Sequence, residues 1–274
     1  MQKKTYHEHK TNWFLYIGTG ITLFMLLLIL LGCFWTPYDP GAMDGSCKTQ
    51  SPSLLHLMGT DNFGRDIFSR VLEGARSTFF IALCVVLIGA FFGSLIGALC
   101  GYFGAWGDEL LMRLCDTITA FPSILLALVI IALLGTGTWN VIWILGILFI
   151  PSFARVMRGE YVRCKSQNYI RSARLMGAGH ARIILRHILP NTLPVFLPTL
   201  SIGFNNAVLA EASMSFLGVG VSADEASLGR MLSDSQNYLL QGAPWYALFV
   251  GLTIVLLVLG FSLLGEGLQQ LRRR

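Results

Sequence analysis

The chain has 274 residues, of which 54% are hydrophobic and only 13% are charged, and its mean hydropathy is +0.63. A soluble domain carries about 25% charged residues, so this chain has too little charge to cover the surface of soluble domains. The same composition excludes a disordered chain. The surplus apolar surface must face lipid, and the composition therefore predicts a multi-pass membrane protein.

Five uncharged runs are long enough for a membrane-spanning helix, which needs about 20 apolar residues to cross about 30 Å of hydrocarbon. The third run is too long for one helix, and the stretch Gly135-Thr136-Gly137-Thr138 divides it into two. The sequence thus predicts an all-α membrane protein with six transmembrane helices. In chain order, the five runs are 13–34, 77–107, 117–154, 188–210 and 244–264.

The first run, 13–34, is longer than the roughly 7–15 residues of a signal-peptide core and lacks a small-residue cleavage site, so we expect an uncleaved helix. Six spans place both termini on one side of the membrane, and fifteen of the twenty Lys and Arg residues fall on that side. Basic residues favour the cytoplasmic side. The sequence therefore predicts cytoplasmic N and C termini, and the pI near 9.0 reflects this asymmetry rather than binding to nucleic acid.

Two predicted outer segments are long enough to fold. The first, 36–76, contains a turn-forming stretch at 59–66 and then an amphipathic helix at 65–76. We expect this helix to lie along the outer surface of the membrane that the chain spans; the alternative is a solvated linker. The second outer segment, 218–243, is long enough to touch a soluble partner.

The cytoplasmic loop at 155–190 carries eight basic residues against a single acidic one. Within it, the stretch 168–176 predicts a short helix closed by Gly177 and Gly179, and a second helical piece is expected at 180–189. An exposed short helix with an apolar face and flanking arginines is typical of a surface that binds another protein; the alternative is a basic loop that only sets topology. The residues of the predicted apolar face are Tyr169, Ala173 and Met176.

Four glycines recur at every fourth residue of the second predicted span. Because a step of four residues turns an α-helix by only about 40°, they form one smooth groove. Such a groove lets a neighbouring helix approach closely, and helix packing is our interpretation, with a substrate path lined by backbone as the alternative. The four residues are Gly89, Gly93, Gly97 and Gly101.

Ionisable residues are almost absent from the predicted spans. Glu211, at the outer end of the fifth span, is a candidate for the transport pathway or for an outer gate. Arg113 and Asp116, at the start of the third span, have the i, i+3 spacing of an ion pair. An ion-driven transporter would place several acidic residues or histidines in mid-membrane, so the sequence disfavours that class.

The chain also lacks the motifs of an enzyme. It has no phosphate loop of the form G-x-x-x-x-G-K-[ST] and no hydrolase motif. No Cys or His cluster has metal-ligand spacing, and Cys33 and Cys47 lie near the outer face, where a disulfide can form. We therefore expect no catalytic residue, cofactor or metal in this chain, and the energy for any transport must come from a partner.

The cytoplasmic loop resembles the coupling motif of ABC importer permeases, which reads Glu-Ala-Ala, three residues, Gly, and a stretch ending in Leu-Pro. This chain has Arg171-Ser172-Ala173, three residues, Gly177, and then Leu189-Pro190. It departs from the motif where Arg171 replaces the glutamate and Ser172 the first alanine. A further departure is Leu228-Gly229, where the family usually has Trp-Gly.

Other phrases resemble the second permease of the peptide/nickel branch of this family, in the same order along the chain. They run from the first helix to Gly265-Glu266-Gly267. They include Gly59-Thr60-Asp61-Asn62-Phe63-Gly64-Arg65-Asp66, Gly101-Tyr102-Phe103-Gly104, Asp108-Glu109-Leu110-Leu111-Met112-Arg113, Phe121-Pro122-Ser123, His187-Ile188-Leu189-Pro190-Asn191 and Glu211-Ala212-Ser213-Met214-Ser215-Phe216-Leu217-Gly218.

The resemblance implies a type I ABC importer permease fold in the bacterial cytoplasmic membrane. It implies a tail, first helix and outer segment at 1–76, a transmembrane type-1 domain at 77–267, and a basic cytoplasmic tail at 268–274. The implied partners are a second homologous permease that forms a heterodimer, two cytoplasmic ATPase subunits that bind ATP and Mg²⁺, and an extracytoplasmic substrate-binding protein.

The resemblance also implies a role for the short cytoplasmic helix, which would couple the chain to the ATPase. We expect Gly177→Pro or Ala173→Asp to abolish transport without preventing membrane insertion. The implied substrates are di- or oligopeptides, or nickel and metal-chelate complexes; an ion-coupled secondary transporter and a non-transporting assembly protein remain as alternatives. The implied coupling residues are Tyr169, Arg171, Ser172, Ala173, Met176 and Gly177.

Overall fold

The structure is a computed structural model, and it describes residues 12–222 and 224–273. Lys3, Lys4, Lys10 and Arg274, which contribute to the predicted charge asymmetry, lie outside the described residues. The described part is almost entirely helical. Its elements are α1 (Trp13–Phe34), α2 (Ile67–Phe103), α3 (Ala105–Thr119), α4 (Ser123–Leu134), α5 (Thr138–Lys165), α6 (Asn168–Leu175), α7 (His180–Arg182), the π-helical turn η1 (Ile183–Ile188), α8 (Leu189–Phe216), α9 (Leu228–Asp234), α10 (Gln236–Leu240) and α11 (Trp245–Arg273).

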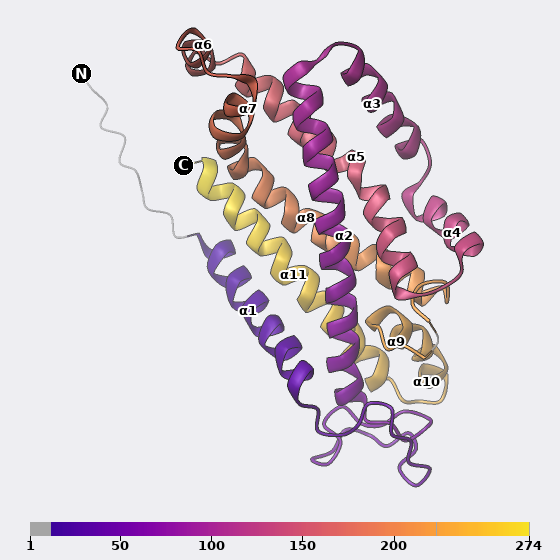
Figure 1. The fold of residues 1–274 in the computed structure, drawn as a ribbon. Helices are drawn as coiled ribbons and strands as arrows, with labels where there is room; N and C mark the ends of the chain where they lie inside the picture. Colours follow the sequence, from indigo (N-terminus) through magenta and orange to yellow (C-terminus); the bar gives the residue numbers. More distant parts are fainter. Residues whose placement is uncertain (1–11, 223, 274) are drawn as a thin grey trace.

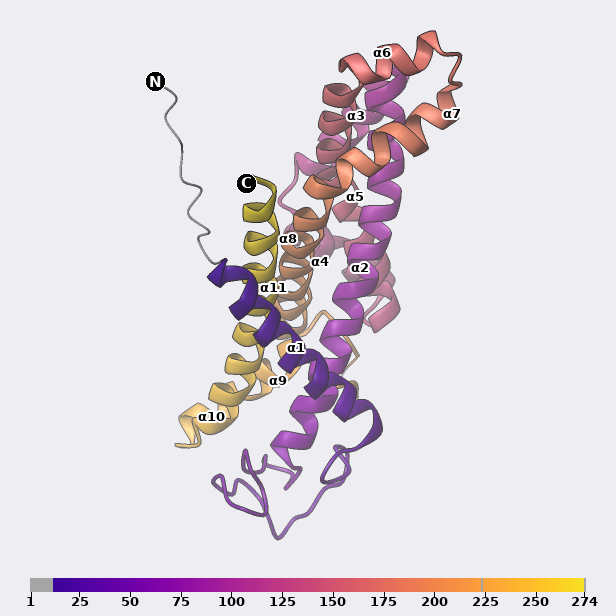
Figure 2. The same ribbon diagram turned by 90° about the vertical axis from the view of Figure 1, so that its left-hand side faces the viewer.

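The long helices form a bundle whose two ends differ (Figure 1). The short helices α6 and α7 form one end, and the loop 35–66 with α9 and α10 forms the other. Figure 2 shows that α11 ends, and α1 begins, at the end of each helix that points toward α6. The described ends of the chain are thus on the side of the predicted coupling helix, as the charge asymmetry indicates.

Five helical segments are long and apolar enough to cross a membrane, and the pair α3 and α4 is bent by 83°. The third span, predicted to begin at residue 117, is therefore not a single straight helix, and the described chain has six spans if this bent pair counts as one. Pro122 has ψ 120° and lies between the two helices, where proline disfavours a helical conformation for the residue before it. With 12 residues, α4 is only about 18 Å long, so it does not cross the hydrocarbon by itself.

Helix α2 begins earlier than predicted and has 37 residues without a break. The prediction of a separate interfacial helix at 65–76 is wrong, because Asp66 caps α2 through a 2.8 Å bond from Ser69 N–H, and the helix continues into the membrane. The amphipathic pattern is real, but its apolar side, which includes Ile67 and Val71, is buried against protein. The boundary expected after residue 76 falls inside this helix.

The four glycines of α2 face α5, and the two helices pack along much of their lengths. A Cβ atom on Gly93 would lie 2.7 Å from the Ile150 carbonyl oxygen, and one on Gly101 would lie 2.6 Å from the Arg158 carbonyl oxygen. Only glycine permits backbones to approach this closely. On the other side of the bundle, α1 packs against α11, and Asn12 Nδ2 donates to the Gly267 carbonyl at 2.8 Å.

The loop 35–66 folds against the outer ends of the helices. Asp61 is fully buried, and its carboxylate accepts bonds from the backbone N–H groups of Phe63 and Arg65 and from Arg65 Nε, the last at 2.6 Å. The N–H of Asn62 donates to the Tyr238 hydroxyl in α10 at 2.7 Å. The Asp61 bonds stabilise the loop itself, and the Asn62 bond attaches it to the segment that follows α8.

Candidate functional site: a coupling helix and a membrane cavity

Helix α6 occupies the position predicted for a short helix, and its end is defined by backbone geometry. Gly177 has φ +80°, a conformation that favours glycine. Its N–H donates to the Arg174 carbonyl at 2.9 Å, and the Ala178 N–H donates to the Ala173 carbonyl at 3.0 Å. These two bonds form a Schellman motif, which terminates the helix.

The faces of α6 differ from the prediction. Ala173 is only 4% exposed and packs with Ile170 toward the rest of the chain, whereas Leu175 is 89% and Met176 81% exposed. The expected face of Tyr169, Ala173 and Met176 is therefore wrong, because Ala173 is buried whereas Tyr169 and Met176 are exposed. The exposed apolar surface consists of Tyr169, Leu175 and Met176.

The remaining residues proposed for coupling lie on the outside of α6. Arg171 and Ser172 are exposed, as is Gly177. Leu175 was missed by sequence reasoning, although its position two residues before Gly177 indicates an exposed helix end. Because Ala173 is buried, Ala173→Asp would disturb the packing of α6 as well as any docking, so Leu175 and Met176 are better sites for a test.

A small cytoplasmic core supports α6. Ile170 packs in a cluster with residues of α2, α5 and η1, among them Tyr102 and Tyr161. The Tyr102 hydroxyl lies 2.8 Å from His180 Nδ1, at the start of α7. The guanidinium of Arg174 lies over the Tyr102 ring, 5.6 Å from its centre, within the range of a cation–π contact. The helix is thus joined to the ends of the long helices.

The charged residues at the start of the third span do not pair as predicted. Arg113 Nη2 lies 2.7 Å from Glu109 Oε1, whereas Asp116 Oδ1 lies 3.2 Å from Arg155 Nη2. The expected Arg113–Asp116 pair is wrong. Asp116 instead joins α3 to α5, because the bend after α3 brings these two helices together.

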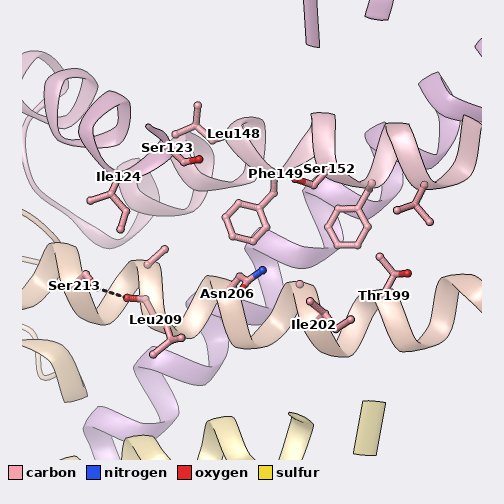
Figure 3. A pocket seen from close by; sticks show the side chains of 14 residues that line it. Ser123, Ile124, Leu148, Phe149, Ser152, Thr199, Ile202, Asn206, Leu209 and Ser213 are labelled. Atoms are coloured by element: carbon pink, nitrogen blue, oxygen red, sulfur yellow. Dashed lines mark hydrogen bonds between the residues drawn. The ribbon is translucent and has the colours of Figure 1, made fainter. Parts of the chain in front are cut away.

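A cavity of about 420 Å³ lies between α4, α5 and α8. Figure 3 shows side chains from these helices facing one another across it, including Phe149 from α5 and Asn206 from α8. None of the described residues that line it is charged. Its polar groups are the side chains of Ser123, Ser152, Thr199, Asn206 and Ser213.

Sequence reasoning missed this cavity, although α8 carries a pattern that indicates it. Thr199, Asn206 and Ser213 are spaced by seven residues, which is about two helical turns, so they lie on one side of the helix. The hydroxyl of Ser213 donates to the Leu209 carbonyl of its own helix at 2.7 Å, and Asn206 is exposed to the cavity. The polar face of α8 is therefore turned toward the cavity.

Glu211 does not line the cavity, although Ala210 and Ser213 do. Its side chain is on another face of α8 and is completely buried. The candidate role in the pathway is therefore not supported by its position. Its carboxyl oxygen Oε1 accepts a 2.7 Å bond from the Ser215 hydroxyl.

The thiols show neither a disulfide nor a metal centre among the described residues. Cys33 and Cys47 are both free. No group of three or more His, Cys, Asp or Glu side chains in the described chain is arranged to hold a metal ion. The arrangement is that of a helix bundle with a neutral cavity and an exposed cytoplasmic helix.

Residues 93–274 match the family of binding-protein-dependent transport system inner membrane components. The chain belongs to this family. It is 37% identical to the dipeptide transport system permease protein DppC of Alkalihalophilus pseudofirmus, over 97% of this chain and 88% of the relative. It is 43% identical to the glutathione transport system permease protein GsiD of Escherichia coli, over 90% of this chain and 82% of the relative. These relatives place it in the peptide/nickel branch.

Solved structures support the fold. An inward-facing structure of the MetNI methionine ABC transporter has a TM-score of 0.58 at 18% identity and covers 75% of this chain and 97% of its own. An amino acid ABC transporter has a TM-score of 0.57 at 20% identity and covers 75% of this chain and 94% of its own. The predicted type I permease fold is confirmed. The chain is an ABC importer permease, a multi-pass protein of the bacterial inner membrane, and the secondary-transporter and assembly-protein alternatives are rejected.

Proposed function

We propose that this permease imports di- or oligopeptides, with the cavity between α4, α5 and α8 as part of their path. The lining of the cavity supports peptide import, because it combines neutral hydrogen-bonding groups, such as Asn206 and Ser152, with the aromatic rings of Phe149 and Phe153. Neutral polar groups suit a peptide backbone, which presents both donors and acceptors. The relatives named for dipeptide and glutathione transport support the same substrate class.

The cavity favours peptides over free Ni²⁺. Nickel sites use imidazole or other strong donor groups, and none of the described residues that line the cavity is a His, Cys, Asp or Glu. A peptide needs no such donor. The substrate-binding protein outside the membrane would deliver the peptide to the permease.

In the proposed importer, each partner subunit has a separate function. A second homologous permease would complete the path as a heterodimer, and two cytoplasmic ATPase subunits would bind ATP and Mg²⁺. The exposed surface of Tyr169, Leu175 and Met176 on α6 would dock in a groove of one ATPase subunit. ATP can shift the bundle between two packed arrangements only through contacts that differ between them, and α6 would supply these contacts.

Uptake by the assembled importer in proteoliposomes tests the substrate class. The complete set of partner subunits is reconstituted with this chain, and ATP-dependent uptake of a labelled dipeptide, glutathione and Ni²⁺ is measured. We expect uptake of a peptide, with a several-fold rise in its KM in Asn206→Leu, because the leucine removes the amide that faces the cavity. Thr253→Val is the control, because the Thr253 hydroxyl bonds only its own helix, donating to the Phe249 carbonyl. Uptake of Ni²⁺ alone would contradict the proposal.

A further inference from the structure

A groove of about 520 Å³ lies between α1 and α2 near their outer ends. Its walls include the apolar side chains of Leu30 in α1 and of Phe79 and Leu83 in α2, and Glu73 and Arg76 of α2 line it as well. Helix α1 is on the opposite side of the bundle from α4 (Figures 1 and 2). The groove is therefore separate from the cavity proposed for peptides, which is lined by α4, α5 and α8.

The contact between α1 and α2 places Arg76 close to the outer boundary of the hydrocarbon. A Cβ atom on Gly32 would lie 2.9 Å from Leu72 Cβ, so the two helices touch there, two residues before α1 ends at Phe34. Arg76 follows Leu72 by one turn of α2 and is thus about 6 Å further into the membrane. An arginine side chain extends toward the headgroups while its apolar stem lies along the helices.

The groove changes from polar to apolar in the direction of the bilayer centre. Glu73 is three residues nearer the outer end of α2 than Arg76, whereas Leu83 is seven residues, or about 10 Å, deeper. The ring of Phe80, which also lines the groove, meets the ring of Trp139 edge-on at 6.3 Å, in the first turn of α5. Tryptophan is enriched at the membrane boundary. Charges at the outer end and apolar walls below them match the polarity of a phospholipid.

The two charged residues of the groove have opposite signs and neighbouring positions. Glu73 and Arg76 have the i, i+3 spacing that puts side chains on the same side of a helix. Arg76 is exposed and Glu73 is half-buried, and none of the ion pairs found in the described chain includes either of them. Charges near hydrocarbon are costly unless they meet a partner or water. A ligand that carries both a phosphate and an ammonium group would pair with both side chains.

We propose that this groove binds one phospholipid of the outer leaflet whose headgroup has a phosphate and a primary ammonium group, as phosphatidylethanolamine does. The Arg76 guanidinium binds the phosphate, and the Glu73 carboxylate accepts hydrogen bonds from the ammonium group. An acyl chain lies along Leu30, Phe79 and Leu83. The bound lipid fills the space between α1 and α2 and so stabilises their packing. This inference is independent of the transported substrate.

Retention of lipid by the purified, assembled importer tests the proposal. The importer in mild detergent is supplied with phosphatidylethanolamine or phosphatidylglycerol, and native mass spectrometry measures the bound lipid. We expect several-fold more phosphatidylethanolamine than phosphatidylglycerol. Arg76→Leu should lower the retained phosphatidylethanolamine at least about tenfold, because a hydrogen-bonded charge pair is lost. Arg113→Leu is the matched control, because Arg113 is also exposed but pairs with Glu109 of α3 and does not line the groove.

A second variant separates headgroup recognition from a folding defect. Glu73→Gln removes the partner of the ammonium group and leaves Arg76 in place. We expect retained phosphatidylethanolamine to fall several-fold while phosphatidylglycerol is retained at least as well as by the unmodified importer. The preference between the two lipids would then be lost in a variant that still binds lipid.

Three results would overturn the proposal. Equal retention of the two lipids by the unmodified importer would show that the headgroup is not recognised. Equal retention of phosphatidylethanolamine by Arg76→Leu and Arg113→Leu would exclude the groove as its site. Cys33 also lines the groove, and crosslinks from a photoreactive reagent on Cys33 to the second permease would show that a protein segment fills the groove instead. None of these results would affect the assignment of peptides as substrates, which depends on uptake measurements and on the cavity variant.

Discussion

The permease has a short helix at each end of its bundle, and the two present their apolar residues in opposite ways. At the cytoplasmic end, α6 leaves Leu175 and Met176 almost fully exposed. At the outer end, α9 buries Leu228 and Met231 completely among α2, α8 and α11. Both helices follow or precede long spans and have similar lengths, so length does not explain the difference.

The comparison shows how a role can be inferred from burial. An exposed apolar residue on a structured helix end has no stabilising contact in its own chain, and such a surface indicates a partner. A buried short helix contributes instead to the internal packing. The exposure of the cytoplasmic helix therefore supports its proposed docking role, whereas the outer helix is part of the bundle itself.

The largest expected effect is on the stability of the outer end. Met231→Ala creates a cavity in the packed core and should lower the free energy of unfolding by about 2–5 kcal/mol. Met176→Ala removes an exposed side chain and should change it by less than about 0.5 kcal/mol. Thermal unfolding of the purified permease in detergent measures both. Equal losses of unfolding free energy in the two variants would contradict the distinction between the buried helix α9 and the exposed helix α6.

The second expected effect is on docking at the cytoplasmic end. Leu175→Asp together with Met176→Asp places two charges in the proposed contact, and central contact residues contribute about 2 kcal/mol or more to binding. We expect the ATPase subunits to be lost from the purified complex and uptake to fall at least about tenfold. Leu54→Asp is the control, because Leu54 is also exposed but lies in the outer loop. ATPase retained by the double variant would exclude this surface as the docking site.

The smallest expected effect concerns the turn that ends α6. Gly177→Ala forces a side chain into a backbone conformation with φ +80° and should cost about 1 kcal/mol, so we expect uptake to fall severalfold. Gly177→Pro should be more severe, because proline requires φ near −65°. Gly179→Ala is the matched control: Gly179 has φ −70°, and a Cβ there meets no atom within 4 Å. An equal effect of the two alanine variants would show that the turn geometry is unimportant.

Much of the fold could be predicted from the sequence because lipid imposes simple requirements. Uncharged runs of about 20 residues have to cross the membrane as helices, and four glycines at every fourth position indicate a close helix contact. The short helix before Gly177 could also be predicted, because periodicity and a glycine stop are local properties. The sequence contains Pro122 but does not show that the helix breaks there, since membrane helices often tolerate proline.

Only the folded structure shows which face of each helix is buried against the rest of the chain and which is exposed. A periodic pattern shows that the stretch 65–76 and α6 are amphipathic, but not what covers the apolar side. Neighbouring helices bury the first and leave Leu175 and Met176 of the second exposed. The same holds for α8, where Asn206 faces a cavity and Glu211, on another face, is completely buried. The order, apolar character and orientation of the helices follow from local composition and from the membrane, so they could be predicted. The exact bounds of the helices and the environment of each side chain depend on residues distant in the chain, which only folding brings together.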